Sequence, residues 1–535
     1  MVYFKQQEGM SMKLNRYELQ SRAQWAEAGI VLPQFDPGAM AAETAKAPAW
    51  VHFGAGNIFR AFPAALQQRL LNLGAVKTGI VVAEGYDYEI IDALFAPHDN
   101  LSLLVTLKAD GTIEKTVIAS VAEALKVDST NARDFARLKE IFRAPSLQMA
   151  SFTITEKGYS LARGDGSPLP DVAADFKAGP AAPHSYIGKL AALCYERYLA
   201  GALPLALVSM DNCSHNGDKL CTAVTAFAKE WTENGLADPG FSVYIADPAK
   251  ISFPWSMIDK ITPRPDTAVK QMLLECGFAD ADGSITAKNT FIAPFVNAEE
   301  TQWLVIEDHF PNGRPPLEQA GVIFTDRQTV DKVEKMKVCT CLNPLHTALA
   351  IFGCLLGYTK ISDEMKDADL VRLIETVGYV EGLPVVVDPG ILDPKAFIDN
   401  VVQVRLPNPF MPDTPQRIAC DTSQKLSIRF GETIKSYQHA PGLDVASLRA
   451  IPLVLAGWLR YLQGVDDAGR LFDCSPNPLL ESARKRLASD LPGLLADAAI
   501  FGVDLHEAGL AERVTALLAE LSRGPGSVRR ALQSI

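Results

Sequence analysis

A lysine, an asparagine and a histidine lie within ten residues of one another, ahead of an apolar, helix-like run. They are Lys337, Asn343 and His346 in the segment KMKVCTCLNPLHTALAIFG, residues 335–353. A lysine can take the proton from an alcohol, and amide and imidazole groups can hold the oxyanion that forms. The segment therefore indicates chemistry at a hydroxyl group.

Each of the three residues also has an ordinary structural interpretation. Lys337 could be a solvated surface lysine. Asn343 precedes a proline, a favourable start for a helix, so it could be only a cap. His346 lies on an apolar helix and could be a satisfied core histidine. The choice depends on what the rest of the chain provides.

The composition bounds the class of protein. A chain of 535 residues is too long for one core and predicts two large domains. Its net charge of −12 argues against a nucleic-acid partner. The first residues contain no apolar signal region, and no run of about 18 apolar residues occurs, so we expect a cytoplasmic protein without a membrane partner.

The nine cysteines are scattered through the chain and lie mostly in apolar runs, as buried reduced thiols do. Cys339 and Cys341 beside His346 would suit zinc, but no second pair of ligands with suitable spacing follows. We therefore predict no metal, and we disfavour a zinc-dependent alcohol dehydrogenase.

The elements that would position this chemistry begin with a glycine turn. Residues 50–53 predict a short buried strand, followed by Gly54-Ala55-Gly56-Asn57-Ile58-Phe59-Arg60 and a helix through residue 73. Gly54 permits a tight turn, Gly56 lets the backbone approach a pyrophosphate, and the helix that starts near Asn57 offers free N–H groups. The usual third glycine is missing. Arg60 near its place could contact a phosphate or be an ordinary surface arginine.

A second predicted strand, residues 79–83, ends at Glu84, where an acid would accept hydrogen bonds from an adenosine ribose. Such an acid favours NAD over NADP, because it repels a 2′-phosphate. Asp87 is the competing candidate. Further strands are predicted at residues 101–107, 149–155 and 205–209. The last runs into a polar cluster at 210–217, which is either a ligand site at a strand end or a capped turn.

The sequence pattern changes after residue 291, and helical periodicity dominates from residue 330. Prolines at 407, 409, 412 and 415 exclude a continuous helix before Arg417. A helix between Arg417 and Lys425 would place both cations on one face, where they could grip a carboxylate or a hydroxyl-rich substrate. Alternatively, they are two solvated cations. We predict a leader at 1–45, a dinucleotide-binding domain at 46–300 and a mostly helical domain at 301–535.

Several segments together resemble the polyol-specific long-chain dehydrogenases, over nearly the whole chain after about residue 45. The segments are HFGAGNIFRAF (52–62), TITEKGYS (153–160), SMDNCSHNG (209–217), FPWSMIDKITP (253–263), WLVIEDHFPNGRPPLEQAGV (303–322), the Lys337 segment, and RLPNPFMPDT with the following DTSQKL (405–426). The resemblance implies an α/β Rossmann-type N-terminal domain, a mostly α-helical C-terminal domain, and metal-free hydride transfer between NAD and a secondary alcohol.

The resemblance also implies roles for single residues. Lys337 would be the general base, with Asn343 and His346 polarising the oxygen and Glu334 serving as a proton-relay carboxylate. The substrate shell would comprise Asn212, Asp259, Arg417 and Lys425. A lysine base needs a pKa well below its ordinary value near 10.4, and burial and nearby cations would lower it.

One departure from the family concerns spacing. Family members usually place the asparagine five residues after the lysine, whereas here Lys337 and Asn343 are six apart. In a straight helix, Lys337 and His346 would then face opposite ways. A helix that begins at Pro344 would remove the conflict, and a π-bulge is the other possibility. Lys335 is a weaker alternative base.

The expected substrate is a sugar acid or polyol. A hexuronate such as fructuronate, reduced to mannonate, is the first choice, because two cations suit a carboxylate and the long leader departs from typical mannitol enzymes. Mannitol with fructose is the runner-up, and tagaturonate is a further candidate. A non-catalytic NAD sensor is the remote alternative, although it would not need the lysine, asparagine and histidine. We expect a monomer or small homo-oligomer.

Overall fold

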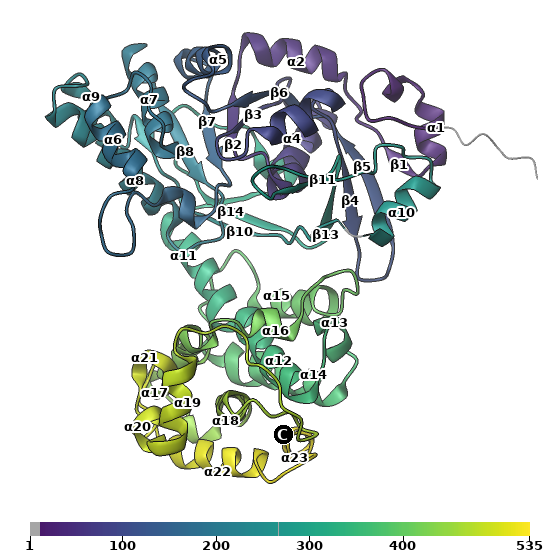
Figure 1. Ribbon diagram of the computed structural model, residues 1–535, viewed down its shortest axis with the longest axis vertical. Helices are drawn as coiled ribbons and strands as arrows, with labels where there is room; N and C mark the ends of the chain where they lie inside the picture. The colour runs from purple at the N-terminus through teal and green to yellow at the C-terminus, as the bar shows by residue number, and fades with distance from the viewer. Residues whose placement is uncertain (1–10, 266) are drawn as a thin grey trace, which may run out of the picture. The chain divides into compact units, whose positions relative to one another are not determined.

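The computed structural model describes residues 11–265 and 267–535. The chain divides into two compact units between Val330 and Asp331, apart from Ala109–Gly111 (Figure 1). The division predicted at residue 300 falls earlier, because β14 (Trp303–Glu307) pairs with β10 (Ser256–Asp259) inside the first unit.

The first unit is built on a six-stranded parallel sheet. Its strands, in spatial order, are β6 (Val121–Lys126), β3 (Ile80–Glu84), β2 (Trp50–Phe53), β7 (Met149–Phe152), β8 (Leu205–Ser209) and β9 (Ile251–Ser252). The chain proceeds outward from β2 through β3 to β6, and then returns to the other side of β2 with β7. This reversal gives the strand order of a Rossmann-type fold, as predicted.

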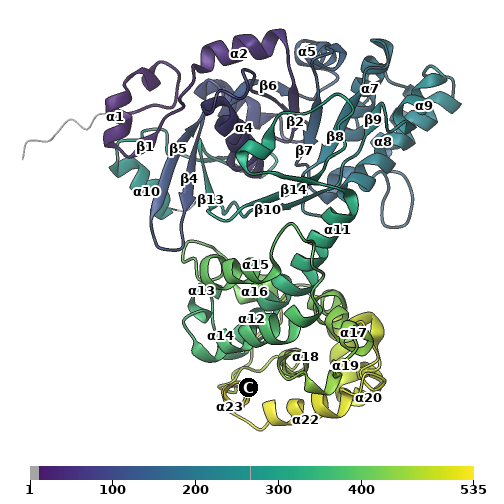
Figure 2. The same ribbon diagram turned by 180° about the vertical axis from the view of Figure 1, so that it is seen from behind.

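Helices cover both faces of this sheet (Figures 1 and 2). The described helices of the first unit are α1 (Arg22–Glu27), α2 (Pro37–Lys46), α3 (Asn57–Ala61), α4 (Pro63–Asn72), α5 (Ala132–Arg143), α6 (Pro170–Ala178), α7 (Tyr186–Leu199), α8 (Asn216–Glu233), α9 (Gly240–Ala246) and α10 (Thr267–Glu275). Val51 and Phe53 pack in a core with α5, α7 and α8. Trp50 packs on the opposite face with α4 and with side chains of β10 and β14. Alternate residues of β2 are therefore buried on both sides.

Smaller sheets complete the first unit. Strands β1 (Ile30–Val31), β5 (Ile113–Ile118), β4 (Ser102–Leu107) and β13 (Phe295–Glu299) form one sheet, β15 (Ile323–Thr325) pairs with β14, and β11 (Ser284–Ile285) pairs with β12 (Phe291–Ile292). The strand predicted at 101–107 is therefore present as β4, but it lies outside the parallel sheet. It pairs antiparallel with β5 through a hairpin.

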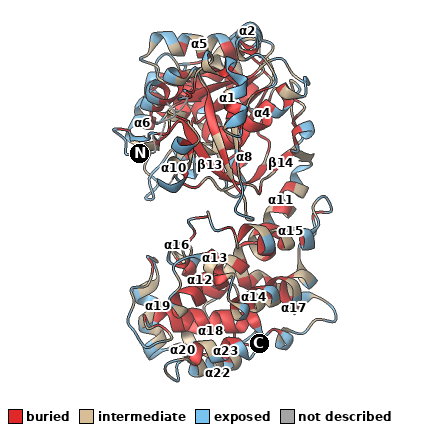
Figure 3. Ribbon diagram, turned by 90° about the vertical axis from the view of Figure 1, so that its right-hand side faces the viewer, coloured by how far each residue is buried: buried red, intermediate tan, exposed pale blue. Residues whose placement is uncertain are grey.

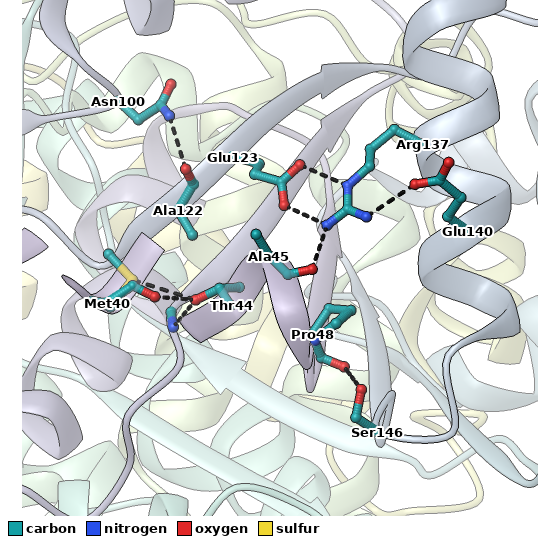
Figure 4. Close-up of polar contacts among 11 residues, drawn as sticks. Met40, Thr44, Ala45, Pro48, Asn100, Ala122, Glu123, Arg137, Glu140 and Ser146 are labelled. Carbon is teal, nitrogen blue, oxygen red and sulfur yellow. Dashed lines mark hydrogen bonds and ion pairs between the residues drawn. The ribbon is translucent and has the colours of Figure 1, made fainter. Parts of the chain in front are cut away.

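The predicted leader packs as part of the first unit where it is described; its residues 1–10 lie outside the described range. Thr44 of α2 accepts a hydrogen bond from the backbone N–H of Gly79 at 2.8 Å, just before β3. Arg137 of α5 donates to Glu123 at 2.8 Å and to the carbonyl of Ala45 at 3.1 Å (Figure 4). These contacts fix α2 beside β6 and α5.

The second unit is helical throughout its named elements. Its helices are the C-terminal part of α11 (Arg327–Met336), then α12 (Asn343–Leu356), α13 (Ile361–Glu364), α14 (Ala368–Glu375), α15 (Pro394–Asn400), α16 (Pro415–Ile418), α17 (Glu432–His439), α18 (Ala450–Leu462), α19 (Leu480–Ser489), α20 (Leu491–Leu495), α21 (Ala498–Phe501), α22 (Ala511–Leu521) and α23 (Ser527–Gln533). Helices α12 and α18 form its buried centre (Figure 3). They approach closely where Gly457 faces the ring of Phe352. The predicted helical C-terminal domain is confirmed.

Among the described residues, one helical run, 327–356, has the length and apolar character of a membrane span. Within the protein, 78% of its most apolar stretch is buried. Burial of this kind is what the core helix of a globular unit shows.

Candidate active site

The glycine turn after β2 is fixed by backbone geometry. Gly54 has a φ of +107°, and a Cβ there would lie 2.3 Å from the carbonyl oxygen of Thr153. Only glycine therefore fits this position without strain. At Gly56, by contrast, a Cβ would meet no atom within 4 Å. The protein leaves open space beside Gly56, as the approach of a pyrophosphate to the backbone requires.

A cavity of ≈ 620 Å³ opens at this turn. Its walls include Gly54 and Gly56 after β2, Glu84 at the end of β3, and Thr153 and Thr155 after β7. The cavity thus lies at the carboxyl ends of the strands, where the order of the parallel sheet reverses. Open α/β sheets bind nucleotides at this position, and the volume suits a cofactor. The described residues therefore fit a dinucleotide.

Glu84 borders the cavity and also stabilises the glycine turn. One carboxylate oxygen accepts from the backbone N–H of Ala55 at 2.8 Å, and the other accepts from Tyr86 at 2.7 Å and Asp87 at 3.0 Å. These bonds fix the two loops that border the cavity. Asp87 accepts from Thr286 at 2.6 Å. A ribose contact by Glu84 stays a prediction.

Arg60 does not lie where a phosphate contact would require it. Its side chain is 2% exposed, and within the described structure neither Arg60 nor Asn57 borders the cavity. The guanidinium donates to the carbonyl of Ala293 and to the side chain of Asn57, each at 2.8 Å. Burial lowers the pKa of Arg60 to about 10. In this geometry the pair holds α3 against the segment before β13, rather than offering a phosphate contact.

The polar cluster after β8 organises the loop that follows β7. Asp211 accepts from the backbone N–H groups of Ile154 and Thr155 and from the hydroxyl of Tyr159, at 3.0, 2.8 and 2.5 Å. Thr155 is held at a φ of +63°, which is unusual for a residue with a side chain. The predicted substrate residue Asn212 is exposed in the adjacent turn. Asp259 is buried in β10, also in the first unit.

Lys337 begins a π-helical turn, Lys337–Cys341, directly after α11. The backbone N–H of Leu342 donates to the carbonyl of Lys337 at 3.1 Å, five residues back. The π turn accommodates the extra residue, as one of the two alternatives predicted. Helix α12 begins at Asn343, one residue before the predicted start. Lys337 is 3% exposed, which excludes the interpretation as a solvated surface lysine. Glu334 lies on α11 and is partly exposed.

Asn343 and His346 occupy the first turn of α12. The N-cap position is Leu342, and no side chain caps the helix, so the interpretation of Asn343 as a cap is wrong. His346 Nε2 lies 3.5 Å from a carboxylate oxygen of Asp413, yet it is buried without a hydrogen-bond partner. It is therefore not a satisfied core histidine.

The ionisation of His346 follows from its surroundings. Burial lowers its pKa to about 4; Asp413 opposes this, and the nearby Arg405, Arg429 and Arg417 add to it. The imidazole is neutral at pH 7, so its contact with Asp413 is not a salt bridge there. A neutral imidazole can donate a hydrogen bond to a substrate oxygen and remain uncharged.

Arg417 and Lys425 are not joined by a helix. Helix α16 ends at Ile418, and Asp421 adopts a φ of +54°, which interrupts the predicted run. Arg417 pairs with Asp413. Lys425 donates to the carbonyl of Cys420. Burial and the nearby Arg429 lower the pKa of Lys425.

Two residues near His346 are missing from the sequence-based set. Asp413 lies in the proline-rich segment before Arg417 and faces His346 only in the folded unit. Arg429 follows Lys425 by four residues, and its backbone N–H donates to the carbonyl of Lys425 at 3.0 Å. That spacing of one helical turn is the signal that would have found it.

In the described residues, no group of three or more histidine, cysteine or acidic side chains is placed to hold a metal ion. All nine cysteines are described, and each is a free thiol. The zinc alternative at Cys339 and Cys341 therefore gains no support from geometry. Metal-free chemistry stays a prediction.

Comparison with known proteins covers both units. A family model for the mannitol dehydrogenase Rossmann domain matches residues 48–319, and a model for the mannitol dehydrogenase C-terminal domain matches residues 329–522. The chain is 52% identical to D-mannonate oxidoreductase of Thermotoga maritima, over 98% of this chain and 99% of that protein.

Two solved structures are also similar. D-sorbitol dehydrogenase in a substrate-free form has a TM-score of 0.79 at 26% identity, covering 94% of this chain and 98% of that one. Mannitol 2-dehydrogenase of Pseudomonas fluorescens, in a ternary complex with NAD and D-mannitol, has a TM-score of 0.68 at 27% identity, covering 98% of this chain and 99% of that one.

Proposed function

The chain belongs to the mannitol dehydrogenase family, and we propose that it is an NAD-dependent oxidoreductase that interconverts D-fructuronate and D-mannonate. The observation that carries the proposal lies in the second unit, where Lys337, Asn343 and His346 share a short segment with an excess of cations around His346. The name and the 52% identity of the Thermotoga maritima relative support the choice of substrate.

The cofactor would be held by the first unit. Gly54, Gly56 and Glu84 border the cavity that fits a dinucleotide, with Asn57 and Arg60 supporting the turn. Bound NAD would supply or accept the hydride at the substrate carbon. An acid at position 84 favours NAD over NADP.

The proton would be handled by the second unit. In the reductive direction Lys337 gives its proton to the oxygen of the ketone, and in the oxidative direction the neutral amine takes the proton from the alcohol. The amide of Asn343 and the neutral imidazole of His346 donate hydrogen bonds to the same oxygen as it gains negative charge. Glu334 on α11 exchanges the proton with solvent.

The proposed substrate residues are Asn212, Asp259, Arg417 and Lys425. Asn212 and Asp259 belong to the first unit, and Arg417 and Lys425 belong to the second. The amide of Asn212 and the carboxylate of Asp259 suit hydroxyl groups of the substrate. The two cations suit a carboxylate of the substrate. Mannitol with fructose is the second candidate, because the similar Pseudomonas fluorescens structure contains D-mannitol. Tagaturonate is a third. We further infer a cytoplasmic enzyme that acts as a monomer or small homo-oligomer.

A spectrophotometric screen tests the proposal. Oxidation of NADH is followed with fructuronate, tagaturonate, fructose and xylulose, and each assay is repeated with NADPH. We expect fructuronate to give the highest kcat/KM, with NADH as the better cofactor. Faster reduction of fructose than of any uronate would refute the substrate, and a preference for NADPH would refute the role of Glu84.

A further inference from the structure

Arg429 lies beside the first turn of α12. Its guanidinium Nη1 donates to the hydroxyl of Thr347. That hydroxyl in turn donates to the carbonyl of Asn343 at 2.8 Å. The guanidinium is thus tied to the turn that carries both Asn343 and His346.

The charge of Arg429 is not balanced by an acid. Burial lowers its pKa to about 10, with no carboxylate acting to raise it. Within residues 11–265 and 267–535, Thr347 is its side chain's hydrogen-bond partner and it forms no ion pair. Its Nε and Nη2 atoms are not among the fully buried side-chain atoms that lack a hydrogen-bond partner in the described structure. A ligand can therefore reach them.

Other arginines of the second unit show the contrast. Arg417 is paired with Asp413, so its charge is already neutralised. Arg460 is buried, but its guanidinium donates to three backbone carbonyls, those of Leu521, Val465 and Asp466, and the charges of Asp466 and Asp467 also favour its ionised form. Arg429 has neither compensation. A partly buried cation without a carboxylate is costly, which favours an anion at this position.

The surroundings of Arg429 indicate which anion that is. The guanidinium contributes to the lowered pKa of both His346 and Lys425, so it shares one electrostatic environment with the proposed substrate groups. An anion bound to Arg429 would therefore lie near His346 and Lys425. A carboxylate on the substrate meets this condition.

We propose that Arg429 recognises the carboxylate of the substrate and thereby sets the preference for a sugar acid over a neutral ketose. The inference rests on the proposed function. Two parallel hydrogen bonds from Nε and Nη2 would hold the carboxylate, a geometry that lysine cannot reproduce. Arg417, already paired, would contribute less to this preference than Arg429.

The test compares substrate preference in Arg429→Gln and in the unmodified protein. The measured quantity is the ratio of kcat/KM for fructuronate to kcat/KM for fructose, with NADH. Loss of a charge-assisted pair predicts that this ratio falls by about 30-fold or more. Arg429→Lys should keep part of the preference, because the charge remains. An unchanged ratio, or a larger change in Arg417→Gln, would overturn the proposal.

A matched variant separates recognition from positioning. Thr347→Val removes the hydrogen-bond partner of Arg429 but keeps its charge, and we expect the ratio to stay within about threefold. If Thr347→Val lowered the ratio as much as Arg429→Gln, Arg429 would only position α12, and the proposal would fail.

A binding assay distinguishes failure of the proposed function from failure of the role proposed for Arg429. The thermal shift with D-mannonate is compared with the shift with D-mannitol, in the presence of NAD. Arg429→Gln should lose the extra shift with mannonate whichever ketose the unmodified protein reduces. If the unmodified protein preferred fructose while Arg429→Gln still lost the mannonate shift, the proposed function would fail and the role of Arg429 would stand. If Arg429→Gln kept that shift, the role proposed for Arg429 would be refuted, and the proposed function would be unaffected.

Discussion

The two units hold their proposed functional residues by different physical means. In the first unit, Gly54 is required by a backbone with a φ of +107° and by the carbonyl of Thr153. In the second unit, Lys337 and His346 are held on an irregular helical path, and burial, together with charged groups from other segments, sets the ionisation of His346. The first arrangement depends on shape, whereas the second depends on charge and burial.

This difference decides which substitutions should matter and how they should be measured. A site defined by backbone shape tolerates no added atoms where the backbone is crowded, as at Gly54, and its failure should show in cofactor binding. A site defined by ionisation should keep its fold after substitution and lose proton transfer or change its pH dependence. Three experiments separate these behaviours.

The largest expected effect is at Lys337. Removing its amine in Lys337→Ala should lower kcat by about 10² or more, because general acid–base catalysis contributes about 10²–10⁴. NADH affinity should be retained, since the proposed cofactor cavity lies in the first unit. Steady-state kinetics and fluorescence titration with NADH measure the two quantities.

Lys335 provides the matched control. Its side chain is 57% exposed and pairs with Asp331 at 2.8 Å. Lys335→Ala should therefore keep kcat within about twofold, as expected for an exposed ion pair of small energy. Near-normal turnover in Lys337→Ala, or a large loss in Lys335→Ala, would move the base from 337 to 335.

An intermediate effect is expected at the glycine turn, where two glycines separated by one residue should behave differently. Gly54→Ala forces a clash and a strained φ, so it should destabilise the first unit by about 1–3 kcal/mol and reduce NADH binding. Gly56→Ala adds a methyl group only to open space, so it should keep the melting temperature but weaken NADH binding about tenfold. Equal melting temperatures for both variants would contradict the shape-based interpretation of Gly54.

The smallest effect concerns a buried acid of the second unit. Glu364 is 0% exposed, and both of its carboxylate oxygens lack a partner. Burial raises its pKa to about 9. Because the folded pKa of Glu364 lies above its unfolded value, the contribution of this side chain to the free energy of unfolding is largest below about pH 4.5. That contribution falls as the pH rises toward 9.

Glu364→Gln cannot ionise, so it should remove this pH dependence. At pH 7 the variant should be more stable, by up to roughly 3 kcal/mol, which corresponds to several degrees in melting temperature. At pH 4.5 the two proteins should melt together. A stability difference that does not grow between pH 4.5 and 9 would show that Glu364 is not held in its neutral form.

The same contrast explains what could be predicted from the sequence. The glycine turn, Glu84 and four strands of the parallel sheet, β2, β3, β7 and β8, are specified by residue type and local pattern, and they lie where predicted. The outer strands β6 and β9 were not predicted. The sheet that contains β4 could not be assigned, because the pairing of β4 with β13 and of β5 with β1 joins segments far apart in the chain. Periodicity reports which residues are buried but not which strand they meet.

In the second unit, the residue types were evident but their relations were not. Lys337, Asn343 and His346 follow one another in sequence, so their common segment was predictable. The approach of Asp413 and Arg429 to His346 depends on the packing of segments at 413 and 429 against α12. A helix between Arg417 and Lys425, which would place both cations on one face, is interrupted at Asp421, whose left-handed conformation is not strongly indicated by an aspartate alone.

The π turn at Lys337–Cys341 has a consequence for recognising related proteins. A wide turn lets a helix gain or lose one residue locally while the residues on either side keep their surroundings. A search pattern written with a fixed interval from the lysine to the asparagine would therefore pass over this chain, although each residue type is present. The interval should be written as variable, whereas the two residues between Asn343 and His346 can stay fixed, because both side chains share one regular turn of α12.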